Sequence, residues 1–395
     1  MKDSIKARNG SPQSVAVVLG EIDLVTALGR AGIPCAVSAV PGDPALFSRH
    51  ARWALPWVDP RSDPGAMTAT LEGFARTQGR PPTLYYNGDT DLIYVSRNRA
   101  VLERSFRYVV PDADLVETLV DKLRWQDLAE KLGLPVPRAA VLGSGGPPPS
   151  ESLSWPLVAK PAQGRHTAWR NRFGPSKAIL AKTGPELEDV RRQLPDEPLM
   201  VQEFVPGPES EVYSYHVYVD DDYKVAAEFT GQKTRTWPPQ FGETTALSVG
   251  LDSGIAAMGR DMVAALKLRG VAKFDYKRAP TGQWFLLEVN PRFTLWHNAG
   301  ASAGVNIPAM VHADLNGARR LSQSITGPAQ WCHPTADFRA ARATGLPLWK
   351  WLRWASACDA RWALTWRDPM PFVRGVVGKK LRRMLTSSRR PEGRP

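Results

Sequence analysis

Hydrophobic and polar positions in the first part of the chain follow the periods of strands and helices. Residues Ser14–Gly20 form an apolar run that ends in glycine, which predicts a buried strand. Residues Glu21–Ala31 have helical spacing, and a second strand is predicted at Cys35–Val40. This βαβ order predicts an open α/β domain. The run lacks GxGxxG, so a scaffold or a wall of the substrate site is favoured over a dinucleotide site.

A later strand is predicted at Pro82–Tyr86, and a polar loop that begins with Asn87 follows it. Ligands of open α/β sheets bind at the carboxyl ends of the strands, which makes Asn87 and Asp89 candidate substrate residues. The same residues are also typical of an ordinary turn, and that interpretation is favoured.

The middle of the chain predicts an α+β arrangement. Residues Leu115–Leu132 and Gly254–Leu268 have helical spacing, and Leu295–Ile307 predicts a loop into a helix that continues to about Leu315. Strands are predicted at Trp155–Lys160, Leu199–Gly207, Glu211–Asp220 and Lys224–Thr230, the last two forming a meander. Lys160 ends an apolar strand, where an unpaired ammonium is costly, so phosphate binding is as well supported as a structural role.

The most informative stretch is a predicted hairpin of Val271–Lys277 and Gln283–Val289. Asp275 lies on the first strand, while Glu288 and Asn290 end the second. Two carboxylates and a carboxamide are hard oxygen ligands of the kind that Mg²⁺ takes beside substrate phosphates. An amphipathic hairpin with solvated acids is the alternative interpretation.

Three cations are candidates for binding the anion that such a metal holds. Arg292 comes two residues after Asn290. Lys233 and Arg235 lie two apart within Phe229–Thr245, which predicts that they share one face of an extended segment. That spacing favours an anion site, with a solvated edge strand as the alternative.

Composition limits the class of protein. The chain has 395 residues, 43% of them apolar and 23% charged, which is typical of a globular protein of two or three domains. No apolar run reaches the length of about 18–20 residues that spans a membrane. Cys35, Cys332 and Cys358 are far apart, so they indicate a reducing compartment and neither a disulfide framework nor a zinc site. We therefore expect a cytoplasmic protein.

The basic charge is concentrated near the end of the chain. Fourteen Lys/Arg and four Asp/Glu lie from Trp331 onward, which accounts for +10 of the net charge of +12. Five tryptophans are interleaved with these cations in residues 338–395. This pattern fits a peripheral membrane surface or an acidic partner, and equally a packed helix followed by a disordered end. Nucleic-acid binding is less favoured, because no recognisable motif accompanies the charge.

Taken in order, these signals resemble the ATP-grasp superfamily of ATP-dependent ligases. Within it they are most similar to the predicted carboligase branch related to carbamoyl-phosphate synthase and D-aspartate ligase. The resemblance covers residues 112–317 and rests on Asp121-Lys122 before GLPVPRAAVL, on VAKP, QEFVPG and FTGQKTRTWPPQFG, and on the pair FDYK and LLEVNPR. Each motif is weak alone, but five in the right order are specific.

The resemblance implies an α/β (α+β) fold class. A flexible leader at 1–13 would precede an N-terminal open α/β pre-ATP-grasp domain at 14–111. An ATP-grasp fold of two α+β subdomains would follow at 112–330, with a small lid subdomain at about 135–205. A Trp/Arg-rich, basic helical extension would end the chain at 331–395.

It also implies roles for individual residues. Lys122 and Lys160 would neutralise the phosphates of ATP. The interdomain hinge would bind the adenine edge, chiefly through the backbone of its second and fourth residues, and consists of Gln202, Glu203, Phe204 and Val205. Either Glu209 or Glu211 would reach the ribose. The metal ligands for Mg²⁺ or Mn²⁺ would be Asp275, Glu288 and Asn290, and the catalytic cations would be Lys233, Arg235 and Arg292.

Two departures from the family pattern stand out. The loop Ala162–Lys177 corresponds to a flap that is usually rich in glycine, but here it is basic, with Arg165, Arg170 and Arg172. These cations would clamp phosphates by charge in place of backbone amides, or would mark weakened turnover. Asp275 also stands where glutamate is more usual, which keeps the type of ligand but shortens its reach.

The implied function is that of a carboxylate–amine ligase. Such an enzyme uses Mg-ATP to convert a small carboxylate into an acyl phosphate, which an amine or similar nucleophile then captures. The alternative is a catalytically weakened ATP-binding protein that is docked to a membrane or complex by its basic tail. The sequence leaves open the carboxylate, the nucleophile and the oligomeric state.

Overall fold

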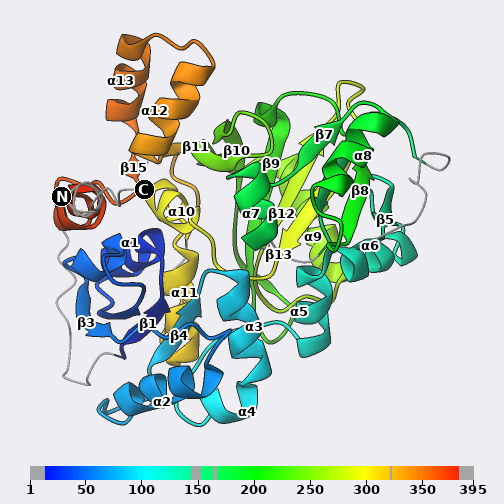
Figure 1. Cartoon of the computed structure of the whole chain (residues 1–395). Coiled ribbons are helices and arrows are strands. Elements are labelled where there is room, and N and C mark those ends of the chain that lie inside the picture. The colour runs from blue at the N-terminus through cyan, green and yellow to red at the C-terminus, as the bar shows by residue number, and fades with distance from the viewer. Residues whose placement is uncertain (1–13, 144–152, 163–166, 321–322, 382–395) are drawn as a thin grey trace, which may run out of the picture.

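The computed structural model describes residues 14–143, 153–162, 167–320 and 323–381, which form three sheets with covering helices (Figure 1). The leader at 1–13, the flap residues Gly164 and Arg165, and the end of the extension at 382–395 lie outside these ranges.

The first sheet is parallel and has the strand order β3-β2-β1-β4. Its strands are β1 (Ala16–Leu19), β2 (Cys35–Ser38), β3 (Ala51–Leu55) and β4 (Thr83–Tyr86). The helices that follow these strands are α1 (Ile22–Arg30), η1 (Pro44–Phe47), α2 (Pro64–Ala75), α3 (Asp89–Arg97) and α4 (Arg99–Leu102). The apolar runs of β1, β2 and β4 are buried throughout, as expected for a parallel sheet that is covered on both faces. The predicted βαβ opening is confirmed.

The second sheet has the strand order β13-β12-β9-β10-β11-β14-β15 and is antiparallel except for its last pair. Its strands are β9 (Val212–Val219), β10 (Val225–Trp237), β11 (Glu243–Gly250), β12 (Gly270–Arg278), β13 (Trp284–Asn290), β14 (Ala329–Cys332) and β15 (Ala360–Arg361). Helix α9 (Ser253–Ala265) packs on one face, and α10 (His297–Ala303) and α11 (Ile307–Leu315) lie between this sheet and the first domain.

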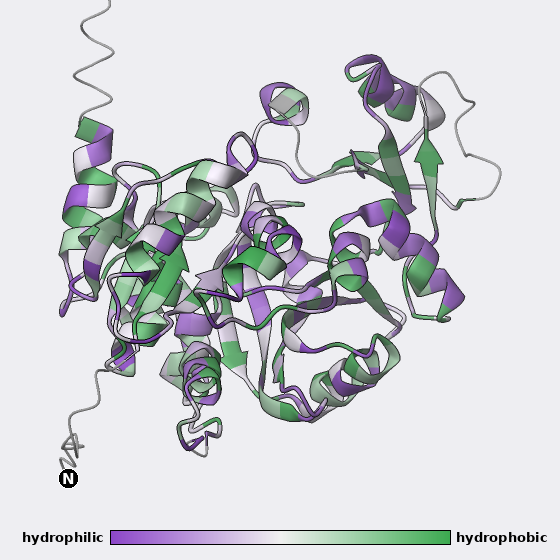
Figure 2. Cartoon of the chain, turned by 90° about the horizontal axis from the view of Figure 1, so that it is seen from below, coloured by the Kyte–Doolittle hydropathy of each residue, from purple (hydrophilic) through white to green (hydrophobic). Residues whose placement is uncertain are grey.

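The third sheet is small and antiparallel, with the strand order β5-β8-β6-β7. Its strands are β5 (Ala139–Leu142), β6 (Leu157–Pro161), β7 (Ile179–Ala181) and β8 (Leu199–Glu203), and its helices are α7 (Thr167–Phe173) and α8 (Gly184–Arg192). It has a hydrophobic core of its own around Trp169 and Leu187, and it projects from the body as a separate lobe (Figure 2).

The predicted single helix at Leu115–Leu132 is wrong, because the chain forms α5 (Ala113–Val120) and α6 (Lys122–Lys131). Asp121 has extended backbone angles, and its carboxylate accepts hydrogen bonds from the amides of Leu123 and Arg124. An N-cap of this kind starts a new helix. Lys122 therefore lies at the beginning of α6, not in the middle of one long helix.

The extension packs on the body of the protein. It contains α12 (Pro334–Ala343), α13 (Leu348–Ala357) and the π-helical turn η3 (Pro371–Val377). One side of α13 is packed through Trp351, Trp354 and Ala355. Near η3, the carboxylate of Asp368 accepts hydrogen bonds from the hydroxyl of Ser48, at 2.6 Å, and from the amide of Arg49. The extension is therefore packed on one side, while Leu348, Trp349 and Leu352 of α13 remain exposed.

Candidate active site

The hairpin of β12 and β13 forms as predicted, and its register brings the candidate metal ligands together. Asp275 pairs directly with Glu288, and Lys273 pairs with Asn290. Residues that are directly opposite in an antiparallel pair point to the same face, as do residues two apart on one strand. The two carboxylates, the carboxamide and the Lys273 ammonium therefore share one face of the sheet.

Asp275 is the buried member of this group, with 1% of its surface exposed. Its carboxylate lies 2.7 Å from the Lys273 ammonium and 4.0 Å from that of Lys233, and it accepts a hydrogen bond from the Ser214 hydroxyl. A buried carboxylate is tolerated only when it is paired and hydrogen-bonded, and these contacts meet both conditions. A hard cation bound here would thus share Asp275 with two lysines.

Glu288 is more open, with half of its side-chain surface exposed. Its carboxylate lies 4.0 Å from the Lys273 ammonium and accepts a hydrogen bond of 3.1 Å from the Asn290 amide. Partial desolvation raises the pKa of Glu288, but the positive charges of Lys273 and Lys177 outweigh that effect and hold the pKa well below its usual range. Glu288 is therefore ionised at neutral pH, as a metal ligand requires.

Arg292 connects the hairpin to the first domain. Its guanidinium donates to the Asn290 carboxamide oxygen at 3.1 Å and lies 2.5 Å from the Asp89 carboxylate at the start of α3. Asp89 is thus more than an ordinary turn residue, since it joins the loop after β4 to the candidate metal site.

Lysines from several elements converge on these carboxylates. Lys160, at the end of β6, donates to the Gln202 side chain at 3.0 Å. Burial, with the nearby charge of Lys122, lowers the pKa of Lys160 to about 8. Burial also lowers the pKa of Lys233, but Asp275, Glu209 and Glu288 raise it to a net value above normal. The two lysines expected to bind phosphates, Lys122 and Lys160, therefore lie close together.

The hinge after β8 has an apolar side. The Phe204 ring lies 5.1 Å from the Lys277 ammonium and makes an edge contact with Phe241 at 6.2 Å, and Val205 is buried. The Glu203 side chain is bound by Arg138 and by the Ser154 amide. The Glu203 backbone amide also donates to the Arg138 carbonyl at 2.9 Å, so the carboxylate and this amide are both already hydrogen-bonded within the protein.

The structure distinguishes the two ribose candidates on the turn η2 (Glu209–Glu211). Glu211 forms an ion pair with Arg278 at 2.9 Å. Glu209 instead interacts through its charge with Lys233 and Lys277. These two residues belong to a group of lysines that interact through their charges, which we call the lysine cluster: Lys177, Lys233, Lys273 and Lys277. Glu209 is therefore the better placed of the two for contact with a nucleotide.

The prediction that Arg235 shares a face with Lys233 is wrong. A β-bulge shifts the register of β10 between these residues, so that Lys233 pairs with Leu247 and Arg235 with Ala246, the next residue along β11. Arg235 makes two hydrogen bonds of 2.8 Å to Asp337 of α12, and its guanidinium stacks 4.2 Å above Trp354. Arg235 anchors the extension and does not join the lysine cluster.

Sequence reasoning missed three cations that the structure places at the site, Lys273, Lys277 and Lys177. Lys273 was detectable, because it lies two residues before Asp275 on a predicted strand. Lys177 interacts through its charge with Glu288. Because Lys177 lies in the segment after α7, far from the hairpin in the sequence, no local pattern predicted this interaction. Of the other flap cations, Arg172 donates to Gln193 at 2.6 Å, within the small lobe.

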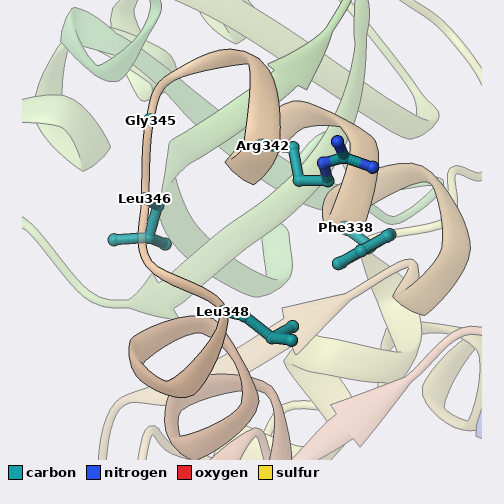
Figure 3. A pocket seen from close by; sticks show the side chains of 5 residues that line it. All are labelled: Phe338, Arg342, Gly345, Leu346 and Leu348. Carbon is teal, nitrogen blue, oxygen red and sulfur yellow. The ribbon is translucent and has the colours of Figure 1, made fainter.

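A separate pocket lies on the extension, between α12 and α13 (Figure 3). It is lined by Phe338, Arg342, Gly345, Leu346 and Leu348. One cation and three apolar side chains do not form a site for phosphoryl chemistry, and the pocket contains none of the hairpin residues.

Comparisons with known proteins place this arrangement in context. No family model matches the chain. It is 24% identical over 217 residues to a D-aspartate ligase of Enterococcus faecium, and the match covers 52% of each chain. It is 27% identical over 216 residues to a D-alanine–D-alanine ligase of Ectopseudomonas mendocina, which covers 50% of this chain and 64% of that protein. The matched region thus spans between about half and two thirds of these relatives.

Solved structures with the same fold cover more of the chain. An N5-carboxyaminoimidazole ribonucleotide synthetase in complex with ADP superposes with a TM-score of 0.62 at 13% identity, covering 81% of each chain. A biotin carboxylase of Campylobacter jejuni gives 0.61 at 12% identity, covering 80% of this chain and 75% of that one. An L-amino acid ligase of Bacillus licheniformis gives 0.58 at 15% identity, covering 82% and 80%.

Proposed function

We propose that the chain activates a carboxylate with Mg-ATP and joins it to an amine, because it is similar in sequence to D-aspartate and D-alanine–D-alanine ligases and similar in fold to an N5-carboxyaminoimidazole ribonucleotide synthetase. A carboxylate is a poor acyl donor, since its leaving group would be oxide. Transfer of the γ-phosphoryl group of ATP to a carboxylate oxygen gives an acyl phosphate. The amine nitrogen then forms a bond to the acyl carbon as the bond to phosphate breaks, and phosphate leaves.

The observation that carries this proposal is the pairing of Asp275 with Glu288, with the ammonium groups of Lys273 and Lys233 at 2.7 Å and 4.0 Å from the Asp275 carboxylate. The oxygens of Asp275, Glu288 and Asn290 suit Mg²⁺, which would neutralise phosphate charge when bound. Phosphoryl transfer depends mainly on positioning and charge neutralisation, so this protein needs few reacting groups of its own.

The positions of the lysines predict different roles for them in binding ATP. Lys160 and Lys122 would bind the phosphates nearer the base, with Phe204 and Val205 beside the adenine and Glu209 at the ribose. Lys233, Lys273 and Arg292 lie at the carboxylates and would stabilise the charge that develops on the transferred phosphoryl group.

The test is the double variant Glu288→Gln/Asn290→Ala. We expect ADP and phosphate release, measured over a panel of amino acids, small carboxylates and bicarbonate, to fall at least a hundredfold, while the far-UV circular dichroism spectrum is retained. Arg278→Gln is a matched control on the same hairpin, because Arg278 pairs with Glu211 outside the lysine cluster. Undiminished turnover in the double variant would refute the assignment.

We also propose that the outer face of α13 binds an anionic lipid surface. Leu348, Trp349 and Leu352 are exposed there, with Lys350 and Arg353 on the same helix. Apolar side chains beside cations suit the boundary of an anionic bilayer. No helix in the described part of the chain is long and apolar enough to cross a membrane.

Vesicle co-sedimentation tests this surface without removing the packed extension. Trp349→Ser/Leu352→Ser is expected to lower pelleting with vesicles that contain phosphatidylserine at least fivefold, while vesicles of phosphatidylcholine alone pellet neither form. Equal pelleting of the variant and the natural chain would remove the proposal.

A further inference from the structure

Lys273 lies between the candidate metal ligands and a group of buried rings. Its ammonium is 2.7 Å from the Asp275 carboxylate. On the neighbouring strand β9 it pairs directly with His216, which pairs in turn with Phe229 of β10. Residues that are directly opposite point to the same face of a sheet, and Trp296, at the start of α10, packs on that face against His216. The Lys273 side chain therefore has a carboxylate on one side and aromatic side chains on another.

These rings form one continuous surface, which we call the aromatic wall: His216, Phe229 and Trp296. The His216 ring stacks on Phe229 with centroids 4.5 Å apart, and its centroid lies 5.1 Å from that of Trp296. The Lys273 ammonium lies over the Trp296 ring, 5.7 Å from its centroid, a distance at which a cation is attracted to an aromatic face. All three rings are buried, and a Cβ at Gly231 would lie 2.5 Å from the Trp296 ring, so the wall is closely packed.

His216 contributes the surface of its ring to the wall. Among the described residues, neither of its ring nitrogens has a hydrogen-bond partner, although the side chain is fully buried. Burial, with smaller effects from His297 and Lys273, lowers the pKa of His216 well below its usual value, so the ring is neutral at neutral pH. A neutral ring does not repel the Lys273 ammonium. Because it accepts no hydrogen bond from that ammonium, it does not draw the ammonium away from Asp275.

The position of the ammonium needs such support, because a lysine carries a compact charge on a long, flexible side chain. Rotation about its bonds would otherwise spread the charge over several positions. Here Asp275 and Glu288 attract the ammonium at 2.7 Å and 4.0 Å, and the aromatic wall fills the space on another side. The charge is thus held beside the two candidate metal ligands.

From this arrangement, we propose that Trp296 and His216 are positioning residues, which hold the Lys273 ammonium where it would meet the transferred phosphoryl group. They act through Lys273, whose charge stabilises the transition state only when it is correctly placed. The inference rests on the proposed function for the role of the ammonium, but the placement of the ammonium by the aromatic wall can be measured without turnover.

The first test compares a variant that removes a ring with one that keeps it. In Trp296→Met the side chain fills much of the space but has no aromatic face, and we expect kcat for ADP release by the full-length chain to fall at least tenfold, with KM for ATP changed less than threefold. Trp296→Phe should stay within threefold of the natural chain. Trp331→Met is the matched control and should also stay within threefold, because Trp331 is similarly buried in the same core but lies on β14, near the opposite edge of the sheet. An equal fall of kcat in Trp331→Met would overturn the inference.

Further variants test whether the wall acts through its rings and through Lys273. His216→Phe keeps a ring without nitrogens and should stay within threefold, whereas His216→Leu should lose at least tenfold in kcat. In the background of Lys273→Met, the change Trp296→Met should cause no further loss, since the wall then has no ammonium to hold. A further tenfold loss in that double variant, or equal losses in the two His216 variants, would refute the assigned role.

Chemical labelling measures the placement of the ammonium without turnover. The full-length chain is treated with acetic anhydride, and acetylation of Lys273 is followed by mass spectrometry. We expect Lys273 to react at least fivefold faster in Trp296→Met and in His216→Leu than in the natural chain. Lys277 should react at an unchanged rate, because it is buried on the same strand but lies beside Phe204. An unchanged rate at Lys273 would overturn the inference, whereas faster labelling without any release of ADP over the substrate panel would uphold it and contradict the proposed function.

Discussion

The ion pair between Arg235 and Asp337 permits a quantitative prediction. Asp337 has no exposed surface and accepts four hydrogen bonds: two from Arg235 at 2.8 Å, one from Thr245 at 3.0 Å and one from the Trp351 indole at 2.8 Å. Asp337→Ala leaves the Arg235 guanidinium buried without its partner. Breaking a buried pair in this way typically costs about 3–5 kcal/mol. We expect the free energy of unfolding to fall by about that amount.

A second variant separates the charge from the packing. Arg235→Met/Asp337→Leu replaces both charges with apolar groups of similar size, and such replacements are often neutral. We expect this double variant to lose about 2 kcal/mol, because the Thr245 and Trp351 donors lose their acceptor at a cost of about 1 kcal/mol each at the low end of the range. The assay is urea unfolding followed by tryptophan fluorescence, with limited proteolysis of the α12–α13 segment as a local readout.

The same variants test whether Arg235 belongs to the extension or to catalysis. If Arg235→Met leaves the unfolding midpoint unchanged but abolishes ADP release, Arg235 acts on the substrate and the structural reasoning fails. If Asp337→Ala and the double variant are equally unstable, the cost lies in lost packing and not in the uncompensated charge.

Two further expectations concern the lysines. The pKa of Lys160, about 8, lies below its ordinary value, so free Lys160 loses its proton as the pH rises through 8. Bound phosphates favour the protonated form of Lys160. We therefore expect ADP affinity, measured by calorimetry, to fall about tenfold from pH 7 to pH 9. Lys160→Arg stays charged and should show no such fall, whereas equal affinities of the natural chain at both pH values would contradict this account. Lys273→Met removes the ammonium 2.7 Å from Asp275, and we expect kcat to fall about 10²–10³-fold with ADP affinity changed less than fivefold. A loss confined to ADP affinity would instead assign Lys273 to nucleotide binding.

Local patterns predicted those parts of the site that local geometry builds. The hairpin was readable because the period of two and the short turn together set its register, and that register places Asp275 opposite Glu288. The end of strand β6 was readable because an apolar run stops at Lys160, one residue before the observed end at Pro161. The same period of two places Lys273 on the face of Asp275, but on these two strands only the carboxylates and the carboxamide were predicted as site residues.

Contacts between residues that are far apart in the sequence could not be predicted from local patterns. The bulge in β10 lies beside Arg235, whose partner Asp337 is 102 residues away on α12. Helix α10 was predicted as a loop because it is rich in small residues, yet these residues allow close packing: a Cβ at Gly300 would lie 2.6 Å from the Phe229 ring.

The contacts between the extension and the first domain also bear on the order of folding. Asp368 binds Ser48 across 320 residues, and the Trp331 indole donates to Asp23 across 308. Contacts of such separation form late, because the loop that they close must first be ordered. During synthesis the first domain can therefore form its parallel sheet early, but it can complete its packing only after the extension has left the ribosome. Until then, the side of the first domain that the extension covers is exposed to chaperones. Pulse-labelled hydrogen exchange on shortened nascent chains would detect this exposure as weak protection of the backbone amides of α1.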